Sequence, residues 1–287
     1  MGNDKVRSLI ENNCNLPPIP MVTSKALAIL NNPDSTLAQL EKVINKDSIL
    51  VSRILNLANS SYYSTLQKIK SVRTAMSLVG YKALGNLIIS ASMKQLYGKF
   101  SLLDKMLWEH SVGTAITSAT LSSEFKLTKP DEAMVAGLLH DIGKTIIAQS
   151  KPEEYREIAE NVYNENLTYF EIEKKVLGFT HCDVGSYLVQ KWNFPIELGK
   201  VIHYHHRVEQ IDLDSMDISQ VKIIAVVDIA NKIMHRMGIG YREPKVDVVI
   251  TELQSWQLLG IQIKEENMEG LLGRLKTTIE EETKNFA

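Results

Sequence analysis

The sequence predicts an all-α protein built as a two-lobed helical bundle with a C-terminal helical tail. Apolar residues recur three and four positions apart, which is the period of an amphipathic helix. The alternation of apolar and polar residues that is typical of β-strands is nearly absent. The composition, 44% hydrophobic and 23% charged, is that of an ordinary globular protein, and 287 residues provide one large or two medium domains. The clearest apolar stripes are Leu37, Leu40, Val43 and Ile44, and Leu50, Ile54 and Leu57.

The first lobe is predicted to consist of short helices separated by proline and capping residues. A short polar N-terminal helix precedes residues 17–20, a Pro-Pro-Ile-Pro run that favours a stiff, extended backbone. Residues 33–36, Pro-Asp-Ser-Thr, offer capping side chains ahead of the Leu37 stripe. Gly80, Gly98 and Gly178 lie where helices are expected to stop.

A second lobe is predicted to begin near Gly98–Leu103, because all seven histidines fall between His110 and His235. Residues 129–132, Lys-Pro-Asp-Glu, open the helix that leads to His140. A second shift in composition lies at residues 241–244, and an amphipathic tail follows. The predicted division is therefore 1–100, 101–240 and 241–287. The apolar tail residues expected to pack on the body are Val248, Leu253, Trp256, Leu258, Leu259, Leu271, Leu272 and Leu275.

The pair His140-Asp141 is the main candidate for chemistry. It lies within residues 136–144, which otherwise have the pattern of a buried helix. Burying an ionised carboxylate without a partner costs several kcal/mol or more. Imidazole nitrogen and carboxylate oxygen are ligand types that divalent metals take. The sequence therefore predicts a metal site at this pair, with Lys144 placed one turn later either to hold a phosphate oxygen or as a surface lysine.

Further candidate metal ligands fall in the same 120-residue stretch. Asp228 interrupts an apolar helix and would also require a cation, although an ion pair with Lys222 or Lys232 is an alternative. A single buried histidine is more often a hydrogen-bonded core residue, so the prediction depends on the whole set. Adjacent histidines on a helix lie about 100° apart, so His205 and His206 would reach two different metals, or one would bind metal while the other orients a group behind the ligands. The remaining candidates are His110 and His181. His203 is expected to pack or to support a ligand from behind, and His235 to be solvated at a helix end. Cys182 is expected to be a small buried hydrophobe, with a soft metal ligand as the alternative.

Several classes of function are disfavoured. A net charge of −2 argues against a bulk electrostatic grip on nucleic acid or anionic membrane. Cys14 and Cys182 are too few for a disulfide framework, and residues 1–5 lack a signal-peptide core. The chain is therefore expected to be cytoplasmic. P-loop, dinucleotide-binding and nucleophile-elbow motifs are missing from the sequence.

The succession His110, His140-Asp141 and Asp228 resembles the HD superfamily of metal-dependent phosphohydrolases, whose signature is H…HD…D on helices. The resemblance adds an HD-superfamily core to the predicted fold. It narrows to the HDOD domain, the HD-related output domain of bacterial signalling. The stretches that carry this narrower resemblance are residues 16–20, 40–50, 55–60, 71–80, 137–144, 181–185 and 192–195.

The related HD-GYP cyclic-dinucleotide phosphodiesterases imply a binuclear centre. By that similarity Asp141 would bridge two metals, water would attack a phosphorus, and Lys144 would contact substrate phosphate. The sequence departs from the HD-GYP pattern at two places. Met106 stands where three-metal members carry Glu, and residues 207–212 lack the GYP triplet. The implied metal ligands are His110, His140, Asp141, His181, His205, His206 and Asp228, with Asp141 and Lys144 as the catalytic pair.

Three functional interpretations follow. The first is a bacterial signal-transduction output module whose metal site binds a phosphate- or nucleotide-type ligand and signals to a partner protein. The second is an active phosphohydrolase or phosphodiesterase, and the third is a structural module in which metal stabilises the fold. The donor set predicts two divalent transition metals, Fe or Mn first, with Ni or Zn as alternatives. Because no receiver domain is attached, the signal is expected to arrive through a separate partner or a small ligand.

Overall fold

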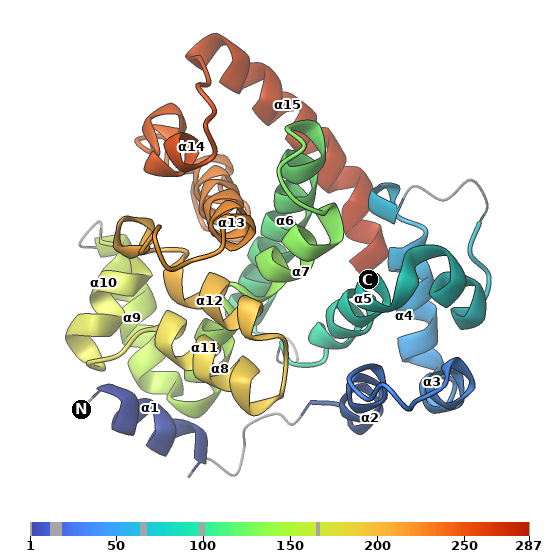
Figure 1. Cartoon of the computed structure of the whole chain (residues 1–287). Helices are drawn as coiled ribbons and strands as arrows, with labels where there is room; N and C mark the ends of the chain where they lie inside the picture. Colours follow the sequence, from blue (N-terminus) through green and yellow to red (C-terminus); the bar gives the residue numbers. More distant parts are fainter. Residues whose placement is uncertain (1, 12–18, 64–67, 98–100, 165–166, 287) are drawn as a thin grey trace.

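A computed structural model describes residues 2–11, 19–63, 68–97, 101–164 and 167–286. Within these ranges the backbone is helical with connecting turns and contains no β-strand, which confirms the predicted all-α class. Figure 1 shows one group of helices around α2 to α5 and a second, larger group around α6 to α13. The predicted Pro17-Pro18 segment and Cys14 lie outside the described residues, as does Gly98 at the expected lobe boundary.

The first group comprises α2 (Met21–Leu30), α3 (Leu37–Ile44), α4 (Ser48–Ala58), η1 (Ser61–Tyr63) and α5 (Val72–Met93). Thr36 caps α3 as predicted: its hydroxyl accepts the Gln39 N–H, and the Gln39 side chain accepts the Thr36 N–H. Gly80 interrupts α5 with φ 82° and ψ 172°, a conformation that glycine adopts without a Cβ clash. The predicted helix stop at Gly80 is therefore a break between two helical segments.

The second group is centred on α6 (Leu102–Glu124), α7 (Pro130–Leu139), α8 (Ile142–Ser150) and α13 (Ile218–Met237). Helix α6 packs against both α7 and α13, and α5 joins the two groups through its contacts with α7. The middle of α13 is apolar all round and buried, as expected for a helix at the centre of a protein. These helices form the core that surrounds the His140-Asp141 pair.

A layer of shorter helices covers one side of this core: α9 (Pro152–Asn164), α10 (Tyr169–Val176), α11 (His181–Lys191), α12 (Ile196–Tyr204) and η2 (Val208–Gln210). Helix α11 packs on both α8 and α12. The N-terminal helix α1 (Gly2–Glu11) lies against α11, where Val6 and Ile10 are buried and Lys5 donates to the Leu177 carbonyl at 3.4 Å. Although α1 comes first in the chain, it therefore packs on the second group of helices; the division at 1–100, 101–240 and 241–287 stays a prediction.

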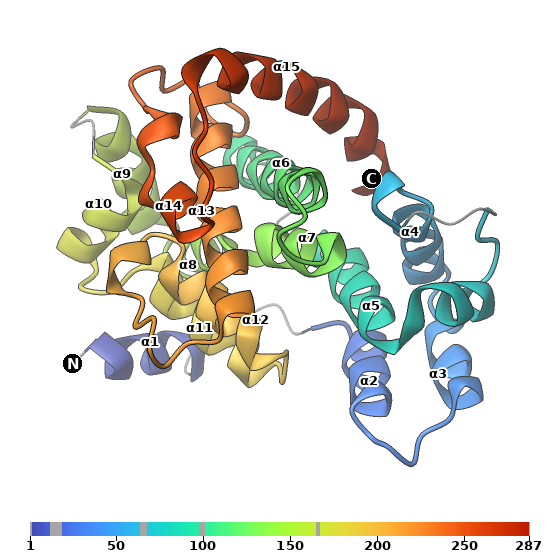
Figure 2. The same cartoon turned by 45° about the horizontal axis from the view of Figure 1, so that its top comes forward.

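The C-terminal tail holds η3 (Ile250–Glu252), α14 (Gln254–Leu258), α15 (Glu265–Glu282) and η4 (Thr283–Phe286). Helix α14 packs on α13, α15 crosses α6, and η4 reaches α4 in the first group, so the tail spans both groups (Figure 2). The expected tail contacts are present: Trp256, Leu259, Leu271 and Leu275 are buried, and the other four tail residues pack against the core while partly buried.

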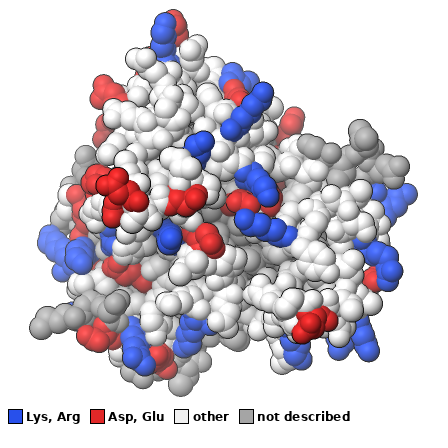
Figure 3. All heavy atoms as spheres, in the orientation of Figure 1, with Lys and Arg blue, Asp and Glu red and all other residues white. Residues whose placement is uncertain are grey.

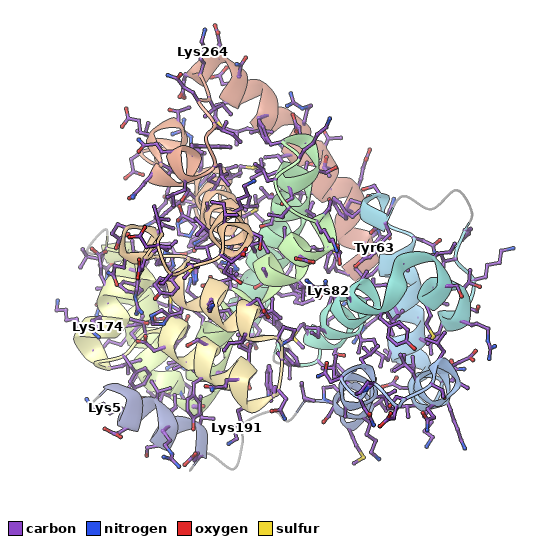
Figure 4. All side chains as sticks on the ribbon, viewed as in Figure 1. Lys5, Tyr63, Lys82, Lys174, Lys191 and Lys264 are labelled. Atoms are coloured by element: carbon purple, nitrogen blue, oxygen red, sulfur yellow. The ribbon has the colours of Figure 1, made fainter. Side chains whose placement is uncertain are left out.

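The two groups of helices meet at a cleft of about 480 Å³ between α2, α5, α7 and α12. Lys82 lies at this cleft (Figure 4), where its ammonium is 2.8 Å from Glu132 of α7. Asn86 donates to Asp131 at 2.8 Å and is buried. Polar contacts thus join α5 to the N-terminus of α7 beside the apolar packing.

Charged side chains of both signs are interspersed on the face seen in Figure 3, without a large area of one sign. Among the described helices, none combines the length and the apolar content that a bilayer crossing requires.

Candidate metal centre

The pair His140-Asp141 lies at the junction of two helices. His140 ends α7, and Asp141, with φ −105° and ψ 11°, precedes α8. The expectation of one continuous buried helix over residues 136–144 was wrong at this point. The turn places Asp141 between His110 of α6, His181 of α11 and His205 at the end of α12. Gly143 allows α8 to approach α11 closely, because an added Cβ there would lie 2.0 Å from the His181 carbonyl oxygen of α11.

Asp141 is the centre of the candidate site, and its two carboxylate oxygens face different histidines. Oδ2 lies 3.4 Å from His110 Nε2 and 3.3 Å from His140 Nε2. Oδ1 lies 3.1 Å from His181 Nε2 and 3.6 Å from His205 Nε2. The donor atoms form two groups, each within 4.8 Å: His110, His140 and Asp141, and Asp141, His181, His205 and His206. Six of the seven predicted ligands are brought together in this way.

The imidazole tautomers leave nitrogen lone pairs directed at Asp141. His140 Nδ1 lies 2.7 Å from the Gly137 carbonyl, and His205 Nδ1 lies 2.8 Å from the Ile202 carbonyl. A carbonyl only accepts, so each Nδ1 carries the proton and donates. When the rings are neutral, Nε2 of both is then an acceptor, buried without a hydrogen-bond partner and close to the Asp141 carboxylate. Lys144 donates to Oδ2 alone, so Oδ1 and the ring nitrogens remain facing acceptors, which a divalent cation between them would satisfy.

His181 is held by a second carboxylate. Its Nδ1 lies 2.6 Å from Glu173 Oε2, and the same oxygen accepts the His181 backbone N–H at 2.7 Å. Glu173 is fully buried on α10 (Tyr169–Val176). A carboxylate behind an imidazole fixes the ring orientation and strengthens the other nitrogen as a metal ligand. This residue was missed in the sequence, where Glu173 occurs in an ordinary charged helical stretch.

Lys144 is buried, which excludes the surface alternative. Its ammonium lies 2.6 Å from Asp141 Oδ2 and 4.8 Å above the ring of Tyr169. The side chains of both Lys144 and Asp141 are 2% exposed. The lysine therefore neutralises part of the Asp141 charge.

The charges of the site shift its pKa values in consistent directions. Burial acts to raise the pKa of Asp141, but His140 and Lys144 outweigh it and hold the pKa well below its usual range. Burial lowers the pKa of His110 to about 3, so this ring is neutral at pH 7. Burial also acts to lower the pKa of His181, but Cys182, Glu173 and Asp141 outweigh it and raise the pKa. A cation binding here would take the place of the His181 proton.

Asp228 differs from its expected place, because it joins neither group of donor atoms among the described residues. Its Oδ2 accepts the Ser255 hydroxyl of α14 at 2.5 Å, and burial raises its pKa. Asn231, one turn further along α13, faces the site instead, with Oδ1 3.0 Å from His110 Nε2. The polar residue of α13 nearest to His110 is thus a neutral amide.

The remaining histidines and Cys182 are placed as follows. His203 lies outside both groups and contacts Arg207, with 3.0 Å between the ring Nε2 and Arg207 Nη1. His235 is buried, and its Nε2 is 2.6 Å from the Tyr241 hydroxyl, so the expectation of a solvated helix end was wrong. His235 does lie in the last turn of α13, but it contacts Tyr241 and the His110 ring, which keep it inside. Cys182 is fully buried, as expected.

Comparison with known proteins assigns the family. The model of the HDOD domain family matches residues 16–208. An uncharacterized protein of Treponema pallidum (strain Nichols) is 26% identical over 198 residues, which are 66% of this chain and 38% of that protein. The chain thus spans less than half the length of this relative.

Solved structures show the same fold. An HDOD domain protein of unknown function from Geobacter sulfurreducens aligns with a TM-score of 0.74 and 25% identity, covering 98% of both chains. A proposed phosphohydrolase of Shewanella amazonensis aligns with a TM-score of 0.72 and 24% identity, covering 99% of this chain and 98% of that one. The described residues are all-helical in the same arrangement, and a His/Asp cluster able to hold metal lies at their centre. The family match covers more than half of the chain, and the chain therefore belongs to the HDOD domain family.

Proposed function

We propose that this chain is a regulatory output module of signal transduction, whose metal-loaded site binds a phosphate- or nucleotide-type ligand and passes that state to a partner protein. The enclosure of the site carries this proposal. Asp141 and Lys144 are almost fully buried, and the ammonium is already engaged with Oδ2 at 2.6 Å. An enzyme that uses Lys144 to contact substrate phosphate would have to separate it from Asp141 in each turnover, whereas a bound ligand needs to reach only the ions at the half-buried His206 edge. The engaged lysine therefore favours binding over catalysis.

The proposed centre would hold two divalent transition metals, Fe or Mn in the first place and Ni or Zn as alternatives. Imidazole-rich sets with one carboxylate suit these ions. His110, His140 and Asp141 Oδ2 would hold one ion, and Asp141 Oδ1, His181, His205 and His206 the other, as the grouping of donor atoms supports. Bound ions would supply positive charge that neutralises Asp141 and attracts phosphate oxygen.

The ligand would approach over His206. This residue is half-buried, whereas the other candidate ligands are buried. The Phe170 ring lies 5.7 Å from the His206 ring and provides an apolar surface beside it. Burial lowers the pKa of His206, and the neighbouring His205 and Lys232 act in the same direction. A phosphate group would meet the positive charge of Lys232 and of the bound ions at this edge of the site.

A binding panel on metal-loaded protein tests the proposal. Phosphomonoesters, cyclic nucleotides and cyclic dinucleotides are titrated with Mn²⁺ or Fe²⁺ present, and both binding and hydrolysis are followed. We expect at least one compound to bind without turnover and to lose at least about tenfold in affinity in Lys232→Gln, since one charge contact to phosphate contributes about that much. If no compound of the panel binds, the proposal of a phosphate-type ligand is contradicted.

An active phosphohydrolase is the second candidate, and one observation favours it. The two oxygens of Asp141 face separate groups of histidines, which is the arrangement that a carboxylate shared by two metals requires. Hydrolysis of a panel member that is lost in Asp141→Ala, a variant still folded by circular dichroism, would establish this function in place of the first.

A further inference from the structure

We infer, on the basis of the proposed metal centre, that its two ion positions are unequal, with Lys144 and Asn231 making one of them the weaker. The first position is the space between Asp141 Oδ2, His110 and His140. The second position is the space between Asp141 Oδ1, His181, His205 and His206. The donor atoms, the neighbouring charges and the satisfied hydrogen bonds all differ between the two positions.

A positive charge already lies at the first position. Lys144 Nζ is 2.6 Å from Asp141 Oδ2, the oxygen that an ion would share with His110 and His140. Both side chains of the pair are 2% exposed, so water screens this charge poorly. An ion entering the first position must either accept the repulsion of the ammonium or displace it from Oδ2. Either course lowers the affinity.

Asn231 completes the first position without adding negative charge. His110 Nδ1 lies 3.3 Å from the Ile239 carbonyl and carries the proton, so Nε2 is an acceptor. Asn231 Oδ1, also an acceptor, faces it at 3.0 Å, and Asn231 Nδ2 is buried without a partner. A cation between the two facing acceptors, His110 Nε2 and Asn231 Oδ1, would satisfy both of them. In the absence of metal, rotation of the amide would instead turn its Nδ2 donor toward His110. Asn231 is thus a candidate ligand that provides a neutral oxygen.

The second position has more donors and a supporting negative charge. Three imidazoles surround Asp141 Oδ1 there. Glu173 accepts from His181 at 2.6 Å and makes that ring a stronger ligand. Lys232 acts on His206 from a half-buried position, where solvent screens it more than it screens Lys144. The electrostatic balance therefore favours the second position.

Titration of the chelator-treated full chain with Mn²⁺ tests this difference, with free Mn²⁺ counted by its electron paramagnetic resonance signal. We expect two steps in the wild type, the weaker at least about tenfold above the stronger in Kd, a factor equivalent to about 1.4 kcal/mol. Asn231→Asp is expected to strengthen the weaker step by about tenfold or more, because it adds a carboxylate beside His110. The same variant leaves the stronger step unchanged.

Two further variants make the test independent of any one substitution. Lys144→Gln removes the ammonium and is also expected to strengthen the weaker step, whereas His206→Ala weakens the stronger one. Asn45→Asp adds the same charge at an exposed site at the end of α3 and should change neither step. Circular dichroism confirms that each variant is folded before titration.

The outcomes separate this inference from the metal centre itself. Two equal steps in the wild type, or an Asn231→Asp titration identical to that of Asn45→Asp, would overturn the inequality while leaving the metal centre in place. If neither the wild type nor Asn231→Asp binds a second ion, the first position does not exist as a metal site. Binding of no ion would overturn the metal centre as well.

Discussion

Replacing Gly143 with alanine should displace α11 and weaken metal binding at the candidate centre. The added Cβ would lie 2.0 Å from the His181 carbonyl oxygen, 2.7 Å from its carbon and 2.9 Å from the Gly185 nitrogen. All three are backbone atoms, so no side-chain rotation relieves the overlap. Ordinary contact begins at 3.4 Å, so the two helices must separate by about 1.4 Å. His181, at the first turn of α11, would move with that helix.

The magnitude follows from two opposing contributions. Alanine in place of glycine within a helix gains about 1 kcal/mol from backbone entropy. Overpacking against fixed backbone costs about 1–3 kcal/mol and sometimes more, and an overlap this severe belongs at the upper end. We expect a net loss of about 2 kcal/mol in the free energy of unfolding, measured by urea denaturation, together with loss of metal that depends on His181.

Gly199 provides the matched control within the same chain. It lies in α12 (Ile196–Tyr204), and a Cβ there would lie 3.6 Å and 3.7 Å from its nearest neighbours, which is ordinary contact. Gly199→Ala should therefore be neutral or stabilising by up to about 1 kcal/mol. If Gly143→Ala proves as stable as Gly199→Ala and binds the same amount of metal, the close approach of α8 and α11 does not hold.

Three other outcomes are expected. Glu173→Gln removes the carboxylate behind His181 and should weaken metal binding by about 10–100-fold, measured by competition with a chelating dye; unchanged affinity would contradict its role. Thr36→Ala removes the cap of α3 and should cost about 1 kcal/mol in urea denaturation without changing metal content, and an unaltered midpoint would argue against the cap. Burial acts to raise the pKa of Asp183, but hydrogen bonds from Thr180 and Arg207 outweigh it and lower the pKa. The contribution of Asp183 to the stability of the folded protein is therefore complete above the unfolded pKa of about 4. This contribution is lost as the pH falls through the lower pKa of the folded state. Asp183→Asn should flatten this acid-side dependence, and an identical pH profile for the variant and the wild type would count against it.

Much of the fold could be predicted because local signals agreed with the final packing. Thr36 caps α3 and Gly80 breaks the helical path, since both effects depend on the immediate backbone. The apolar tail residues pack as expected because a stripe such as that containing Leu271 and Leu275 has to be buried somewhere. The position of α1 on α11 could not be foreseen, because it depends on tertiary contacts of Val6 and Ile10 across many intervening residues.

The candidate site was only partly predictable. Charge buried in an apolar segment indicated Asp141, and the structure brings His110, His140, His181, His205 and His206 to it. The same reasoning applied to Asp228 did not anticipate that Ser255 of α14 satisfies its carboxyl. Helix periodicity gives the spacing of residues along α13 but not the rotation of that helix.

That rotation turns Asn231 toward His110, and no feature of the sequence distinguishes Asn231 from other polar helical residues. The burial of Lys144 was likewise left open, because a lysine one turn after an acidic residue is common on helix surfaces.

The most direct test is metal analysis of the full chain purified without chelators, with Asp141→Ala purified in parallel. Buried nitrogen lone pairs and Asp141 Oδ1, which Lys144 does not reach, face one another inside the protein and would be satisfied by a metal ion. We predict at least about one equivalent of Fe or Mn per wild-type chain and almost none in the variant. Less than about half an equivalent of any transition metal in the folded wild type, even after incubation with Mn²⁺ or Fe²⁺, would contradict the metal centre.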